Sequence, residues 1–104
     1  MSGVPGEVSP ADAHAAADGG ALLLDVREDW EWNEHHVPGA VHIPMQQVPS
    51  RLAEIPEDRD VYVYCKMGGR SARVVDYLRR QGRERAANVS GGIDAWMEAG
   101  LPVE

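Results

Sequence analysis

Hydrophobic residues recur along this chain in short unbroken runs, separated by amphipathic or polar stretches. Runs of aliphatic, β-branched and aromatic residues without charges predict strands that are buried on both faces. The run at 61–64 is of this kind, and strands are also expected at 7–8, as a short edge strand, and at 21–26, 41–43 and 86–89. The stretches between them have the helical period, so strands and helices alternate. This alternation favours an α/β fold with a mainly parallel sheet and helices on both faces.

The stretches between the runs predict the helices. Helical segments are expected at residues 10–18, at 28–36, in two pieces within 44–55 of which the second begins at Pro49, at 71–81, and between 92 and 100. Trp30 and Trp32 are two residues apart and cannot share a helical face, so one of them should be partly exposed. In the last helix, Trp96 and Met97 are both expected in the core.

Length and charge limit the classes of protein to consider. A chain of 104 residues predicts a single domain over residues 1–104, with a flexible start at residues 1–6. Its 17 acidic and 10 basic side chains give a net charge of −7, which argues against a nucleic-acid binder or an anionic-membrane binder. No stretch is long and apolar enough to cross a bilayer. One cysteine and no secretion signal favour a cytoplasmic protein with a free thiol.

Candidate chemistry is concentrated after the Val-Tyr-Val-Tyr run. Cys65 follows this run directly, and Arg70 precedes the next predicted helix, so both lie in the kind of strand-to-helix turn where α/β sheets bind ligands. Gly68 and Gly69 permit positive φ angles, so several backbone N–H groups can form an anion-binding nest. With the charges of Lys66 and Arg70, such surroundings lower a thiol pKa from about 8.5 to roughly 3.5–7.5. We therefore expect a reactive thiolate, which requires N–H groups facing the sulfur and a path to it from solvent.

Several loop residues also have simpler interpretations. A lone cysteine is more often an inert buried residue, although the glycines and the helix start argue against this at Cys65. Arg70 is a partner of the thiolate, a surface cation, or a bridge to a carboxylate with its side chain turned away from the thiol. Ser71 either caps the helix or donates a hydrogen bond to the sulfur. Lys66 and Met67 either influence the choice of substrate or are ordinary exposed loop residues.

Polar residues elsewhere are given structural interpretations. Asp25 and Arg27 end the 21–26 run and should border the same cleft as the cysteine. We interpret them as an ion pair beneath the loop rather than as acid–base groups. His36 and His42 are expected in turns or at the core edge. The chain has no zinc-site spacing, so no metal is expected.

Four segments together resemble the rhodanese (sulfurtransferase) family. The motif Cys-x-x-Gly-x-Arg-Ser after a Val-Tyr-Val-Tyr strand is similar to the active-site loop of that family. The other three segments are LLLDVRE (22–28), HVPGAVHIP (36–44) and NVSGGIDAWMEAGLPVE (88–104). The resemblance implies a three-layer rhodanese-type domain with a mainly parallel five-stranded sheet. It also implies that Cys65 is the catalytic nucleophile and that the substrate-binding loop consists of Lys66, Met67, Gly68, Gly69, Arg70 and Ser71.

The function implied by this resemblance is sulfur transfer through a persulfide on Cys65. The thiolate would take the outer sulfur of a donor such as thiosulfate and pass it to cyanide, a thiol or a protein acceptor, without a cofactor. Two alternatives stay open: a non-enzymatic persulfide carrier or redox-sensing module, and a cysteine phosphatase or arsenate reductase. The phosphatase hypothesis is the weaker one, because those enzymes have Cys-x5-Arg. The spacing here is Cys-x4-Arg, and no motif places a general acid.

Overall fold

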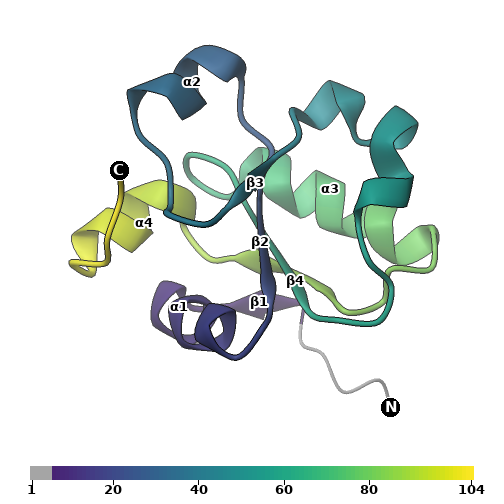
Figure 1. The fold of residues 1–104 in the computed structure, drawn as a ribbon, viewed down its shortest axis with the longest axis horizontal. Coiled ribbons are helices and arrows are strands. Elements are labelled where there is room, and N and C mark those ends of the chain that lie inside the picture. The colour runs from purple at the N-terminus through teal and green to yellow at the C-terminus, as the bar shows by residue number, and fades with distance from the viewer. Residues whose placement is uncertain (1–5) are drawn as a thin grey trace.

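The computed structural model describes residues 6–104, and its sheet joins five strands that all run parallel (Figure 1). The strands are β1 (Glu7–Val8), β2 (Leu22–Asp25), β3 (Val41–His42), β4 (Val61–Tyr64) and β5 (Ala86–Val89). Their spatial order is β1-β5-β4-β2-β3. The predicted α/β fold and its five-stranded parallel sheet are therefore confirmed.

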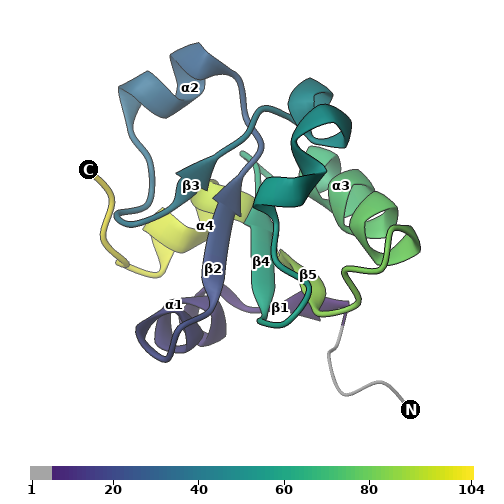
Figure 2. The ribbon, with the colours of Figure 1, turned by 45° about the vertical axis from the view of Figure 1, so that its right-hand side comes forward.

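Helices cover both faces of this sheet. They are α1 (Pro10–Asp18), α2 (Asp29–Glu34), α3 (Gly69–Arg80) and α4 (Gly92–Glu98), with 3₁₀ helices η1 (Met45–Gln47) and η2 (Pro49–Glu54). In Figure 1, α1 and α4 lie on one face of the sheet, and α3 and the 3₁₀ helices lie on the other. In Figure 2, the arrow of β2 points toward α2, which lies beyond the carboxyl end of that strand. The apolar side chains form one buried cluster under each layer of helices.

The strand order places the end of β4 at the centre of the molecule. β4 pairs with β2 on one side and with β5 on the other, and all four of its residues are buried. The chain proceeds outward from β2 to β3 on one side and from β4 to β5 on the other. The point between β2 and β4 is thus the topological switch point, where open α/β sheets bind ligands. Cys65, the residue after β4, lies at this point.

Most differences from the sequence expectations are small. The predicted helix at 28–36 is confined to α2, where Trp30 is 63% exposed and Trp32 is half-buried, as the spacing of the two indole rings predicts. The expectation for Met97 is wrong, because this side chain is 37% exposed. α4 buries Ile93 and Trp96, and the residue after Trp96 is turned about 100° away around the helix. Residues 1–5 of the predicted flexible start lie outside the described residues.

Candidate active site

The loop after β4 makes a tight turn into α3. Gly68 is the N-cap of this helix and has a φ of 111°, a left-handed conformation that favours glycine. The expectation of a positive φ at Gly69 is wrong, because this residue already belongs to the helix. α3 also begins before Ser71, so the expectation that Ser71 caps the helix is wrong. Its side chain is buried inside the first turn and points to the sulfur instead.

The sulfur of Cys65 receives hydrogen bonds from several groups of this turn. The N–H of Gly68 lies 3.1 Å from Sγ, the N–H of Ser71 lies 3.4 Å away, and the Ser71 hydroxyl lies 3.3 Å away. Burial acts to raise the pKa of the Cys65 thiol, but donation from Ser71 and from the N–H groups of Gly68 and Met67 outweighs it. The net pKa lies below the ordinary value. The predicted cradle of backbone N–H groups is therefore present.

The second requirement, an open thiol, is not met in this structure. Cys65 is only 2% exposed. Lys66 and Met67, the next two residues, are both exposed. The N–H groups thus donate to a sulfur atom that solvent barely reaches.

A polar network behind the sulfur includes a residue that the sequence interpretation missed. The Ser71 hydroxyl donates to Oδ1 of Asn88 over 2.5 Å. The amide of Asn88 donates in turn to the Gly68 carbonyl and to the Glu7 carboxylate, each over 3.2 Å. Asn88 is 3% exposed, and it is the one polar residue in the run Ala-Ala-Asn-Val of β5. That break in an otherwise apolar strand is the signal that could have identified it.

Both cations of the loop are paired with carboxylates rather than with the thiol. Arg70 donates to both oxygens of Glu31 on α2, over 2.8 and 2.9 Å, so the bridging interpretation of Arg70 is the one that the structure shows. Donation from Arg70 lowers the pKa of Glu31 to about 2, against the opposing effect of burial. Lys66 pairs with Asp94 on α4 over 2.8 Å. The backbone and the Ser71 hydroxyl, rather than these cations, therefore contact the sulfur.

The start of α4 holds the other side of the loop. The N–H of Ile93 donates to the Cys65 carbonyl over 2.9 Å, and the N–H of Asp94 donates to the Lys66 carbonyl over 3.1 Å. Gly92 has a φ of 62°, and a Cβ atom there would lie 2.4 Å from the Lys66 carbonyl oxygen and 2.5 Å from that of Cys65. No side chain fits between the two segments, so Gly92 permits this close packing.

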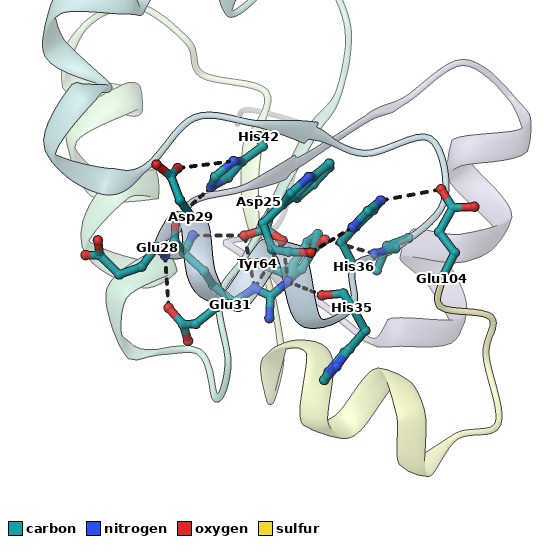
Figure 3. A network of polar contacts seen from close by, with 12 residues as sticks. Asp25, Glu28, Asp29, Glu31, His35, His36, His42, Tyr64 and Glu104 are labelled. Atoms are coloured by element: carbon teal, nitrogen blue, oxygen red, sulfur yellow. Dashed lines mark hydrogen bonds and ion pairs between the residues drawn. The ribbon is translucent and has the colours of Figure 1, made fainter.

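Asp25 and Arg27 form the ion pair that was expected beneath the site. Arg27 donates from Nη2 to the Asp25 carboxylate over 2.7 Å and to the His35 carbonyl over 2.8 Å. Both residues are buried, and the guanidinium lies 5.7 Å from the centre of the Tyr64 ring. Figure 3 shows Asp25 and Tyr64 at the centre of this network. The pair connects β2, β4 and the segment after α2.

The two histidines of interest stack on Trp32. Its ring centre lies 3.7 Å from that of His36 and 4.8 Å from that of His42, and both imidazole rings are nearly parallel to the indole. Figure 3 shows His36 directed toward Glu104 and His42 toward Asp29. Both histidines are half-buried, as expected of the core edge. Residues 6–104 contain no group of three His, Cys, Asp or Glu side chains that could hold a metal ion.

A hollow of about 260 Å³ lies beside the loop, and we call it the side hollow. It is bounded by α2, by the first residue after the cysteine and by α4. Its lining residues are Arg27, Trp30, Glu31, Glu34, His35, Lys66, Ile93, Asp94 and Met97. Arg27 lines this hollow, but Asp25 and Cys65 do not, so it is not the cleft shared with the cysteine that was expected of Asp25 and Arg27. Within the described residues, no helix has the length and apolar character needed to cross a membrane.

Comparison with known proteins links this site to one family. Residues 9–99 match the family model described as "Rhodanese-like domain". A sulfurtransferase of Allochromatium vinosum is 45% identical over 82 residues, which cover 79% of this chain and 77% of that protein. A putative sulfurtransferase of Bacillus subtilis, YtwF, is 41% identical, and the aligned residues cover 77% of this chain and 77% of that protein.

A solved structure agrees over nearly the whole length. The rhodanese-related protein of Thermoplasma volcanium superposes with a TM-score of 0.88 at 30% identity, over 94% of this chain and 96% of that one.

A putative sulfur carrier protein of Bacillus subtilis, YrkF, is 38% identical over 71% of this chain, which spans only 40% of that protein. The resemblance inferred from four sequence segments is thereby confirmed.

Proposed function

Because this chain belongs to the rhodanese-like domain family of sulfurtransferases, we propose that it transfers a sulfane sulfur through a persulfide on Cys65. One observation carries this proposal. Two backbone N–H groups and one hydroxyl converge on Sγ, within 3.1 to 3.4 Å. Donors fixed in this way stabilise negative charge on sulfur without reorganising during the reaction. They support both the thiolate and the persulfide anion that replaces it.

The first half-reaction forms the persulfide. The Cys65 thiolate attacks the outer sulfur of a donor such as thiosulfate, and the bond between the two donor sulfurs breaks. Sulfite leaves with the electron pair of that bond, and the outer sulfur stays on Cys65 as a persulfide anion. Since the thiol is 2% exposed, the loop has to shift for the donor to enter. The N–H groups then hold the terminal sulfur.

The second half-reaction returns the thiolate. Cyanide or an acceptor thiolate attacks the terminal sulfur, the S–S bond breaks, and its electron pair returns to Sγ of Cys65. Two half-reactions that share one covalent intermediate predict ping-pong kinetics. The chain has a single cysteine, so no second cysteine of the same chain takes part in either half-reaction.

Intact mass after incubation with thiosulfate tests the proposal. We expect a gain of one sulfur atom that cyanide reverses and that Cys65→Ser abolishes. The variant should keep the circular dichroism spectrum of the wild type, since serine fits the same site. An unchanged mass with thiosulfate and with an organic persulfide, in a folded wild-type protein, would contradict the proposal.

A persulfide carrier is the second candidate, and the closed loop favours it. A buried sulfur suits a persulfide that has to persist until a partner arrives, and one relative carries the description of a sulfur carrier. The two functions share one intermediate. They differ in the rate of turnover with cyanide, which is fast for an enzyme that acts on small molecules and slow for a carrier. Hydrolysis of aryl phosphates is not expected from either, because the Arg70 side chain is held by Glu31.

A further inference from the structure

The side hollow lies beside the loop that follows Cys65 and is marked by exposed apolar side chains. Four large apolar residues of the described chain are exposed, and three of them border the hollow or the loop beside it. Trp30 on α2 is 63% exposed, Met97 on α4 is 37% exposed, and Met67 on the loop is 71% exposed. Buried Ile93 contributes to the lining between them. Apolar groups gathered at one opening are typical of a surface that contacts a partner.

The charges around the side hollow do not favour a small dianion as the sulfur acceptor there. Lys66 lines the hollow and pairs with Asp94, and Arg70, outside the lining, pairs with the lining residue Glu31. The buried Arg27 is held by Asp25 in the same way.

One carboxylate at the same opening has no partner among the described residues, and further carboxylates lie on α2 nearby. Glu34 lines the hollow, and no hydrogen bond or ion pair of its side chain occurs within residues 6–104. The segment from Glu28 to Glu34 carries four carboxylates and no basic side chain. An approaching group therefore meets apolar side chains surrounded by excess negative charge.

We propose that the physiological sulfur acceptor is a cysteine of another protein, located on a basic segment whose apolar side chain enters the side hollow. This inference rests on the proposed persulfide at Cys65. Charge complementarity with Glu34 and its neighbours orients the segment, and contact with Trp30 and Met97 holds it. The acceptor thiolate then attacks the terminal sulfur, the S–S bond breaks, and the electron pair returns to Cys65. Nearby lysines on the acceptor also favour its thiolate.

Three acceptor peptides test this partner chemistry. The peptides are acetyl-Lys-Leu-Cys-Leu-Lys-amide, its Glu-Leu-Cys-Leu-Glu counterpart, and a Lys-Gly-Cys-Gly-Lys version that lacks apolar side chains. The Cys65 persulfide is first prepared and confirmed by mass, so failure of the proposed function is seen before any acceptor is added. Decay of the persulfide is then followed with each peptide at equal thiolate concentration, and each rate is divided by the rate with cyanide.

We expect the basic apolar peptide to react at least about fivefold faster than either of the others, with the advantage over the acidic peptide reduced by salt. Trp30→Ala should reduce the preference for leucine over glycine, and Glu34→Gln should reduce the preference for lysine over glutamate. Val41→Ala and Glu84→Gln are matched controls, because both residues are exposed away from the hollow. Preferences below about fivefold, or preferences that survive in both Trp30→Ala and Glu34→Gln, overturn the proposal.

Discussion

The hydroxyl oxygen of Ser71 lies 2.5 Å from Oδ1 of Asn88 and 3.3 Å from Sγ of Cys65. A hydroxyl has one proton, so Asn88 and a thiolate at Cys65 compete for the same donor. With the thiol protonated, its S–H can donate to Ser71 while Ser71 donates to Asn88. With the thiolate present, the hydroxyl proton turns to the sulfur and Asn88 loses its donor. Asn88, which does not contact the sulfur, therefore shares the hydroxyl donor that lowers the pKa of Cys65.

Substitution of Ser71 should make this dependence measurable. Ser71→Ala removes the hydroxyl donor that lowers the pKa of the Cys65 thiol, so we expect this pKa to rise. Ultraviolet absorbance of the thiolate, titrated against pH, measures the change. Ser50→Ala is the control, because that hydroxyl donates to the Gln47 carbonyl in an exposed turn. An unchanged titration in Ser71→Ala would show that the backbone N–H groups alone set the pKa.

A carboxylate at position 88 tests the competition itself. Asn88→Asp keeps an acceptor for Ser71 and adds negative charge behind the sulfur, so we expect a higher thiol pKa and slower persulfide formation at neutral pH. The charged side chain that contacts position 88 is Glu7, so the variant also loses the amide's hydrogen bonds to Glu7 and to the Gly68 carbonyl, while the pairs Arg70 with Glu31 and Lys66 with Asp94 stay in place. Persulfide formation should recover at higher pH, and a deficit that is independent of pH would point to a structural effect instead.

Gly92 should be needed for activity beyond its contribution to stability. In Gly92→Ala the new Cβ would clash with the carbonyl oxygens of Cys65 and Lys66. The loop must then shift, and its N–H groups no longer point at the sulfur. We expect persulfide formation to fall at least about tenfold, since oriented donors of this kind contribute that much or more. Gly100→Ala is the matched control: its φ is also positive, at 78°, and nothing lies near its Cβ position. Equal activity of the two variants would contradict this role.

Stability at acidic pH should depend on Glu31. Its pKa is lowered to about 2 in the folded protein, chiefly by Arg70, so its contribution is present above the unfolded pKa near 4.3 and is lost as pH falls toward 2. We expect the free energy of unfolding to decrease by on the order of 2–4 kcal/mol across that interval. Urea denaturation at several pH values should show a smaller decrease in Glu31→Gln, and an unchanged decrease in the exposed control Glu84→Gln.

The covered sulfur predicts selective access by small reagents. Although its pKa is lowered, Cys65 is 2% exposed, so we expect methyl methanethiosulfonate to react much faster than the bulky dianion dithiobis(nitrobenzoate). Each rate is first divided by the rate of the same reagent with a cysteine peptide. We expect the normalised rate of the small reagent to be about ten or more times that of the larger one, because the larger reagent requires the loop to move further. A ratio near one would mean that the loop opens freely.

The sequence was sufficient where local patterns determine structure. The Val-Tyr-Val-Tyr run, the single cysteine and Gly68 placed the turn and its N–H groups correctly, because strand, turn and helix are adjacent in the chain. Side-chain partners were harder to predict, because Arg70 pairs with Glu31, which is 39 residues away in the sequence. No local pattern records such a pairing. The same applies to Asn88, which reaches Ser71 only because β5 lies beside β4.

Burial was also beyond local reasoning. The loop around the thiol packs against α4, and this close approach requires Gly92, which lies 27 residues after the cysteine in the sequence. The exposure of Met97 has a similar origin, because the sheet-facing side of α4 is fixed by tertiary packing.

The hydrogen bonds from the start of α4 to the loop also determine where the N–H groups of the loop point. A planar trans peptide directs its carbonyl and its N–H to opposite sides. With the Lys66 carbonyl bound to Asp94 N–H, the N–H of Met67 is turned toward the sulfur. This orientation comes from the main chain, so substitutions at positions 66 and 67 should change the surface beside the sulfur while its anion cradle stays in place.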